Sequence, residues 1–249
     1  MNKLLLIIIT VSQVFALTNL EVAQQSEKVL SGFEDSTSQM QMKLINARGQ
    51  EKIRTMNMKV LEGEDEDKSL MEFLTPADVK GTKFLNYEHV DKDDDQWLYL
   101  PALKRVKRIS SKNKSGAFMG SEFAYEDLSA FNVKKYHYEG EAKEVRLENK
   151  EMYQTSSAPV SKNSGYTKLI SWIDKKTFLI QKIEYYDRKK ELLKTAYFQE
   201  YKKYNGVYRM VKITMKNTQN DKTTILIWSD EKIKTGLNKK DFHKRYLKK

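Results

Sequence analysis

The sequence predicts a mainly β protein with a few helices (an α+β fold) that folds as one domain. Short stretches in which apolar and polar residues alternate recur over most of the 249 residues, and this period of two is typical of half-buried strands. Turn-forming groups such as Glu62-Gly63-Glu64-Asp65 and Asn205-Gly206 separate the stretches. No repeat or low-complexity linker divides the chain, and β domains of this size are commonly undivided.

The N-terminus has the layout of a cleavable signal peptide. Lys3 precedes an apolar run at residues 4–9, and Val14-Phe15-Ala16 supplies a small-x-small ending. We therefore expect residues 1–16 to be the signal peptide and residues 17–249 to be the mature domain, with a periplasmic location. An uncleaved anchor is the alternative, although the apolar run is shorter than the roughly 20 residues that span a bilayer.

The chain then continues with one helix before the strands begin. Val22, Val29 and Leu30 contribute to an apolar stripe, which predicts an amphipathic helix near residues 19–31. Alternation at residues 40–44 and 56–60 predicts two strands on either side of a turn at residues 47–50. Further strands are predicted near residues 70–74, 82–87, 96–100, 145–153, 166–173, 179–186, 193–201, 207–215 and 223–228.

Two segments interrupt the alternation. Residues 110–131 predict a Gly/Ser loop that carries exposed apolar residues, followed by a short helix for which Ser121 is a candidate cap. Residues 238–247 predict a second short helix. An antiparallel sheet with so few helices can hide one face only by curling on itself, with the helices over the mouth. That architecture leaves a hollow.

The composition narrows the class of protein. The absence of cysteine excludes disulfide bonds, thiolate metal sites and cysteine nucleophiles. Of the 45 basic residues only Lys3 lies in the predicted signal, so 44 remain against 34 acidic residues. In an exported protein this excess favours anionic lipid head groups or an acidic partner, and we predict no nucleic acid as a partner. A basic surface without a partner is the plain alternative.

Motifs for catalysis or metal binding are weak. The three histidines, at positions 89, 137 and 243, have no metal-ligand spacing to one another and no neighbouring G-x-S-x-G turn. The acidic run at residues 91–95 is similar to the start of a calcium loop, but Gln96 stands where the loop needs glycine. We expect a solvated hairpin tip there, no metal and no cofactor. A hydrolase would need a nucleophile close to His89 or His137.

Methionine is the most informative apolar residue. Four of the ten methionines fall on the inward faces of two neighbouring predicted strands. Methionine is unbranched and polarizable, so a wall made of it adapts to a flexible acyl chain. Ordinary core filling is the alternative. The four residues are Met40, Met42, Met56 and Met58.

The strongest signal is an aromatic strand that leads through Pro101 to a basic strand and then to an apolar loop. Residues 96–109 are QWLYLPALKRVKRI, and residues 118–128 are FMGSEFAYEDL. These stretches resemble the outer-membrane lipoprotein-sorting proteins of the LolA-like superfamily, as do TPADVKGT at residues 75–82 and the closing residues 241–247. The resemblance covers nearly the whole mature chain.

The resemblance implies an unclosed antiparallel β-barrel, covered by short helices, whose apolar interior receives acyl chains for passage across the periplasm. It implies a lipid or acylated lipoprotein as cargo, an inner-membrane exporter and an outer-membrane acceptor as partners, and no catalysis. Glu122 stands where relatives commonly have aspartate, and the gating arginine of the best-studied carriers matches no single residue here.

We therefore predict a monomeric, non-catalytic periplasmic carrier, with residues 19–31 and 117–123 as a movable cover over the cavity. The alternative is an accessory subunit of an envelope lipid exporter with a solid interior. The alternation does not decide whether Trp97 or Leu98 faces inward, because the predicted strand at residues 96–100 carries apolar residues on both of its faces. The predicted cavity and cover residues are Met40, Met42, Met56, Met58, Trp97, Tyr99, Phe118, Met119 and Phe123, and the predicted head-group or partner contacts are Lys104, Arg105, Lys107 and Arg108.

Overall fold

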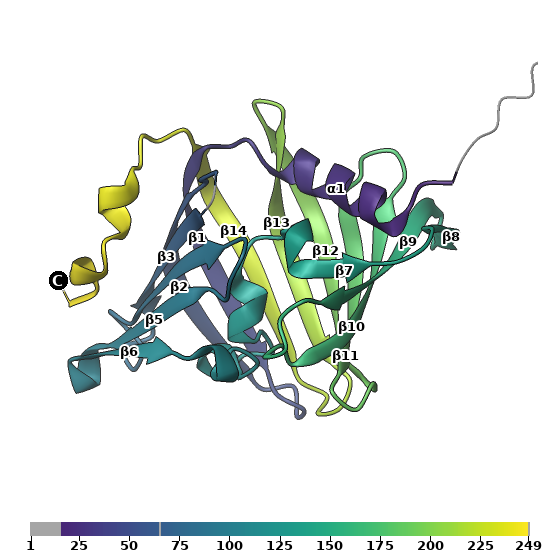
Figure 1. Ribbon diagram of the computed structural model, residues 1–249. Helices are drawn as coiled ribbons and strands as arrows, with labels where there is room; N and C mark the ends of the chain where they lie inside the picture. The colour runs from purple at the N-terminus through teal and green to yellow at the C-terminus, as the bar shows by residue number, and fades with distance from the viewer. Residues whose placement is uncertain (1–15, 65, 249) are drawn as a thin grey trace, which may run out of the picture.

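The computed structural model describes residues 16–64 and 66–248, and one antiparallel sheet dominates it (Figure 1). The predicted signal peptide, apart from Ala16, lies outside the described residues. The 14 strands are β1 (Asp35–Ile45), β2 (Glu51–Leu61), β3 (Glu66–Thr75), β4 (Lys83–His89), β5 (Asp95–Leu100), β6 (Arg105–Ile109), β7 (Tyr136–Tyr138), β8 (Lys143–Leu147), β9 (Lys150–Pro159), β10 (Tyr166–Asp174), β11 (Ile180–Asp187), β12 (Leu192–Tyr204), β13 (Val207–Asn217) and β14 (Thr223–Ile233).

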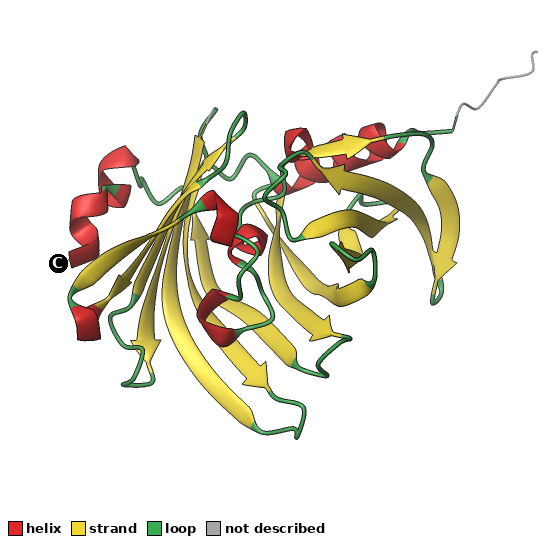
Figure 2. Cartoon of the chain, turned by 60° about the horizontal axis from the view of Figure 1, so that its bottom comes forward, coloured by secondary structure: helices red, strands yellow, loops and turns green. Residues whose placement is uncertain are grey.

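The sheet curls without closing. Its strand order is β6-β5-β4-β3-β2-β1-β14-β13-β12-β11-β10-β9-β7, with β8 also paired to β9. The two ends of this order, β6 and β7, do not pair with each other, so the sheet forms the predicted unclosed barrel. Figure 2 shows how strongly the strands bend around one side. The concave face carries the larger hydrophobic core.

The predicted N-terminal helix is confirmed as α1 (Asn19–Leu30). Thr18 and Glu21 form a capping box, in which each side chain accepts a hydrogen bond from the other residue's backbone N–H. Val22 and Ala23 are buried against the sheet, and α1 contacts β9 and β13. The helix therefore covers one part of the barrel mouth.

A second covering element, which we call the cover segment, comprises residues 110–135. It contains four short 3-10 turns: η2 (Ser111–Asn113), η3 (Phe118–Gly120), η4 (Tyr125–Leu128) and η5 (Val133–Lys135). The predicted short helix is present as the four-residue 3-10 turn η4, but its N-cap is Ala124 and not Ser121. The expected exposure of the apolar residues is wrong at Phe118, which is fully buried because it inserts into the core of the sheet.

Two other expectations need correction. The alternating run at residues 145–153 is a hairpin, because Glu148 adopts a left-handed conformation (φ 54°) that ends β8 before β9 begins. The C-terminal segment forms two 3-10 turns, η6 (Lys239–Phe242) and η7 (Lys244–Lys248), because the extended backbone of His243 divides it. Both turns lie on the convex face, where Phe242 and Leu247 join a second hydrophobic cluster.

Candidate binding cavity

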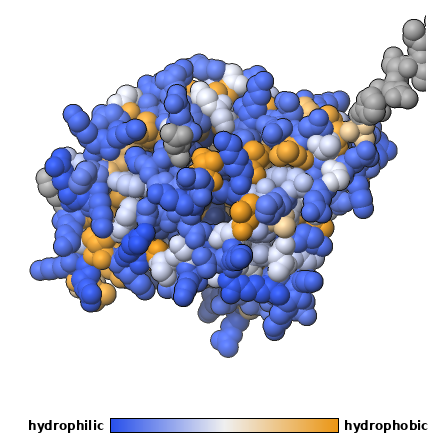
Figure 3. Space-filling view, in the orientation of Figure 1, coloured by the Kyte–Doolittle hydropathy of each residue, from blue (hydrophilic) through white to orange (hydrophobic). Residues whose placement is uncertain are grey.

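A cavity of about 920 Å³ lies between the concave face and its covering elements. Small-molecule pockets typically measure about 300–1,000 Å³, so this cavity is large. Figure 3 shows the surface hollowed near the middle of this face, between hydrophobic side chains. Apolar residues from several strands line its walls, among them Met40, Met58, Ile180, Ala196, Ile213 and Leu226.

Carboxylates line part of the cavity mouth. Burial raises the pKa of Glu27, Glu62 and Asp67 above their ordinary values and the pKa of Glu88 to about 8. The negative charge of Asp67 adds to the upward shift of the other three, whereas Lys135 acts in the opposite direction on Asp67 and Glu88. The cavity lining therefore contains partly or fully buried acidic groups beside its apolar side chains.

Two of these carboxylates hold the cover segment over the mouth. The Glu88 carboxylate, on β4, accepts a hydrogen bond of 2.7 Å from the backbone N–H of Ala130. The Glu27 carboxylate, on α1, accepts one of 3.1 Å from the N–H of Val133. The covering helix and one end of the sheet thus hold the same short stretch of chain.

The cover segment is also bound to the strands at the other end of the sheet. Asp127 forms an ion pair of 2.5 Å with Lys194 of β12, and both side chains are only 4% exposed. The Tyr166 hydroxyl of β10 donates a further hydrogen bond of 2.8 Å to Asp127. The Glu126 side chain accepts a hydrogen bond of 2.8 Å from the backbone N–H of Gly165. The cover segment therefore bridges both halves of the unclosed barrel.

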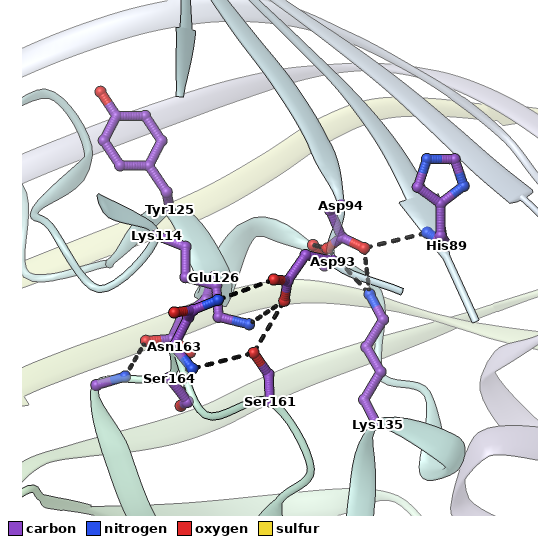
Figure 4. Close-up of polar contacts among 12 residues, drawn as sticks. His89, Asp93, Asp94, Lys114, Tyr125, Glu126, Lys135, Ser161, Asn163 and Ser164 are labelled. Atoms are coloured by element: carbon purple, nitrogen blue, oxygen red, sulfur yellow. Dashed lines mark hydrogen bonds and ion pairs between the residues drawn. The ribbon is translucent and has the colours of Figure 1, made fainter. Parts of the chain in front are cut away.

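A direct contact also crosses the gap between the ends of the sheet (Figure 4). Asp93, in the β4–β5 turn, accepts hydrogen bonds from Ser161 (2.9 Å) and Asn163 (3.1 Å) of the β9–β10 turn, and from Lys114 (3.0 Å) of the cover segment. Burial by itself would raise the pKa of Asp93, but these three donors lower it to about 2. We call these three contacts the seam. The predicted solvated hairpin tip is therefore wrong at Asp93, because the chain folds the opposite end of the sheet against it.

An aromatic cluster fills the concave face beside the cavity. The ring of Phe118 lies 5.1 Å from that of Phe84 and 6.1 Å from that of Phe73, centre to centre. Tyr125 lies 5.6 Å from Phe118 in an edge-to-face arrangement and 5.8 Å from Phe84. The cover segment is thus anchored by apolar packing at this end and by polar contacts over the cavity.

The structure brings most of the predicted apolar site residues onto the concave side. Met40, Met58 and Phe123 line the cavity. Met42 and Met56 are fully buried in the same core without lining the cavity, Phe118 belongs to the aromatic cluster, and Met119 packs against the core. The four methionines therefore face inward as expected, and whether they contact cargo stays a prediction.

Trp97 and Tyr99 are a correction to the predicted lining. Both lie in the convex-face cluster, where the C-terminal Phe242 and Leu247 cover them, and Leu98 faces the concave core. Both alternating sets of β5 are apolar because both faces of this strand are covered. The residues of that convex face therefore do not contribute to the cavity wall.

The predicted basic residues lie together on or beside the edge strand β6. Lys104, Arg105, Lys107 and Arg108 are all exposed, and Arg108 pairs with Asp95. Sequence reasoning missed Glu88 and Lys194. Glu88 lies on the same face of β4 as the core residue Phe84, and Lys194 lies on the same face of β12 as the core residue Ala196. A charged residue at an inward position of an alternating strand was therefore the signal in the sequence.

No metal or catalytic constellation stands out in the part of the chain that the structure describes. Among residues 16–64 and 66–248, no group of three or more His, Asp or Glu side chains could hold a metal ion. The ring nitrogens of His89 face Glu66 (3.2 Å) and Asp95 (3.1 Å), and His137 is exposed. Within those same ranges, no helix is long and apolar enough to cross a bilayer.

Comparison with known proteins agrees with this geometry. The crystal structure of an outer membrane lipoprotein-sorting protein domain from Vibrio parahaemolyticus is 48% identical, with a TM-score of 0.89, over 92% of this chain and 98% of that one. A DUF1329 family protein from Desulfovibrio piger is 28% identical, with a TM-score of 0.86, over 92% and 97% of the two chains.

A LolA superfamily protein from Nitrosomonas europaea shares the fold, with a TM-score of 0.75 at 20% identity over 93% of this chain and all of that one. A family model described as an uncharacterized protein matches residues 65–249. No curated protein matches the sequence. The close and nearly complete match to the Vibrio domain shows that the chain belongs to the outer-membrane lipoprotein-sorting protein family.

Proposed function

We propose that the chain is a periplasmic carrier that binds the acyl chains of a lipid or lipoprotein and passes its cargo toward the outer membrane, without catalysis. The observation that carries this proposal is the cavity of about 920 Å³, which the side chains of the barrel leave unfilled. The name of the Vibrio relative, an outer membrane lipoprotein-sorting domain, supports the same role.

The character of the cavity wall supports an acyl chain as the bound group. Residues such as Ile180, Ile213 and Leu226 offer no hydrogen-bonding side chain, so a hydrocarbon displaces only weakly held water. Burying an acyl chain contributes roughly 0.8 kcal/mol per methylene, or about 11 kcal/mol gross for 14 carbons. Binding is therefore readily favourable, and release is the harder step.

The cover segment offers a way to open the cavity. Its contacts over the hollow include hydrogen bonds and ion pairs, such as Glu88 to Ala130 and Asp127 to Lys194, which water or a partner can replace. Its aromatic anchor at Phe118 stays packed while the polar contacts separate. A donor or acceptor protein that binds the open form would shift the population toward it.

Analysis of the bound lipid tests the proposal. The full chain is expressed with its signal, purified from the periplasmic fraction without detergent, and examined by native mass spectrometry and by organic extraction. We expect one or more lipid masses above that of the protein, and uptake of a fluorescent fatty acid after delipidation. A protein that carries no lipid and takes up no probe would contradict the carrier function and favour the accessory subunit.

A further inference from the structure

One end of the molecule combines an exposed apolar tip with a concentration of positive charge. The β5–β6 hairpin turns through η1 (Pro101–Leu103), and the Leu103 side chain at its tip is 62% exposed. Lys104 and Arg105 follow Leu103 directly in the sequence, and Lys107 lies with Arg105 on the edge strand β6. An exposed leucine among lysines and arginines is the composition of a surface that meets an interface between water and lipid.

The C-terminal segment extends this surface. Turn η7 contacts β4 and β6, and Figure 1 shows β6 and the C-terminus at the same end of the molecule. The Lys244 ammonium lies 5.0 Å from the centre of the Trp97 ring, and Trp97 is the cross-strand neighbour of Arg108. The Trp97 side chain therefore lies between the basic strand β6 and Lys244 of the C-terminal segment.

Most of these charges have no acidic partner. In the two described ranges, none of the salt bridges includes Lys104, Arg105, Lys107, Lys244 or Arg245. Lysines on an edge strand protect a sheet against pairing with a second copy. That role accounts for β6 alone, since it explains neither the exposed Leu103 nor the charges on the C-terminal turns.

Apolar packing contributes the main contacts that hold this surface in place. Phe242 and Leu247 are buried against Leu85 and Trp97, and the Tyr87 hydroxyl donates a hydrogen bond of 2.7 Å to the carbonyl of Phe242. Lys104, Arg105 and Lys107 take no part in these contacts, so they can be replaced without removing them.

We propose that this end, formed by the β5–β6 hairpin and the C-terminal turns, docks on the anionic surface of a lipid bilayer with Leu103 entering the head-group region. The choice of a bilayer rests on the proposed carrier function, because a carrier must meet the membrane it serves. Each lysine or arginine near an anionic surface contributes favourably to the free energy of membrane binding. An apolar anchor that enters the membrane adds an independent contribution.

Vesicle binding tests the docking surface. The probes are vesicles of phosphatidylcholine alone and of phosphatidylcholine with about one third phosphatidylglycerol. We expect binding to the anionic vesicles only, and a loss of about a hundredfold when Lys104, Arg105 and Lys107 are all replaced by Glu. Raising the salt from about 0.1 M to about 1 M should also release the protein, because the Debye length falls from about 10 Å to about 3 Å.

Two matched controls sharpen the test. Replacing Lys189, Lys190 and Lys202 by Glu makes the same change in net charge on the β11–β12 turn and β12, and should leave binding unchanged. Because the chain has no cysteine, a polarity-sensitive dye can be attached through Leu103→Cys or, as the control, through Tyr197→Cys on β12. Only the dye at position 103 should shift to the blue on anionic vesicles.

Each contrary result has a definite meaning. Absence of binding to anionic vesicles would overturn the docking surface and point to an acidic protein partner. An equal loss in both triple variants would show net charge, not this surface, to be responsible, and would also overturn it. The lipid content of the same preparations is measured separately, so an empty cavity in a protein that still binds vesicles would contradict the carrier function alone.

Discussion

Two halves of the same concave face differ in how they are filled. Near Phe73 of β3 and Phe84 of β4 the cover segment inserts Phe118, and all three rings are fully buried. Over β11 to β14 the cover segment stays above the sheet, and residues such as Ala196 and Ile180 face the cavity. The backbone of the sheet continues through both halves, and they differ in that the cover segment inserts the Phe118 ring into only one of them.

The two halves also hold the cover segment by different forces. Aromatic packing excludes water and is lost only when a void forms. Over the cavity the cover segment makes polar contacts, such as the Asp127–Lys194 ion pair, beside the apolar contacts of Phe123 and Leu128. Water can replace the partners of the polar groups when the segment lifts, so we expect this end to separate more readily than the aromatic end.

Removing the aromatic anchor should have the largest effect. Phe118→Ala leaves a void in the filled half, and such changes typically cost about 3–5 kcal/mol. The matched change Phe198→Ala removes a half-buried ring that already faces the cavity, and should cost clearly less. Urea unfolding of both variants measures the difference. Equal losses would mean that the two halves are equally well packed.

Glu88 should give the next largest effect, and this effect should depend on pH. Its pKa of about 8 results first from burial, while Asp94 and Asp67 add to the shift and Lys135 opposes it. The folded protein therefore holds a proton that the unfolded chain releases near pH 4.5. Stability falls as pH rises from about 4.5 to about 8, and the part of this loss between about pH 6 and pH 8 is on the order of 3 kcal/mol.

Glu88→Gln removes the titration and keeps the shape of the side chain. We expect the free energy of unfolding of the variant to change less than that of the wild type between about pH 6 and pH 9. The difference should grow up to about pH 8 and stay constant above it. A variant that loses as much stability as the wild type over this range would assign the titration to another group.

Much of the fold could be predicted from the sequence because half-buried strands impose a period of two. The alternation of Met40 and Met42 with polar residues located β1 and its inward face. The inward face of β5 could not be predicted, since the C-terminal Phe242 covers Trp97 from 145 residues away in the chain. Alternation reports that a face is covered, but not which part of the chain covers it.

The same limit applies to the candidate site. The sequence predicts a solvated turn at Asp93, and only the curl of the sheet brings Ser161 against this residue. Phe118 lies in a Gly- and Ser-rich segment that predicts exposure, yet the insertion of its ring makes it one of the most buried residues. Contacts across the unclosed gap depend on the overall curvature, which no local pattern records.

The seam should have a smaller effect on stability than either Phe118 or Glu88. Asp93→Ala removes one half-buried carboxylate and leaves Lys114, Ser161 and Asn163 to water, at a cost of about 1 kcal/mol. We expect faster release of a fluorescent fatty acid, because the ends of the sheet separate more readily. Asp91→Ala, in the same turn but exposed, is the control. Unchanged release in Asp93→Ala would remove the seam from the opening motion.

The smallest effect on stability should come from filling the hollow half. Ala196 is buried and faces the cavity, so Ala196→Met places its longer side chain in free space and should cost less than about 1 kcal/mol. Bound lipid, measured by mass spectrometry, should nevertheless fall. Ala142 is a buried alanine of the same core away from the cavity, and Ala142→Met should cost about 1–3 kcal/mol because no space receives it. If both variants lose the same stability and keep their lipid, the apparent space beside Ala196 is not where the cargo binds.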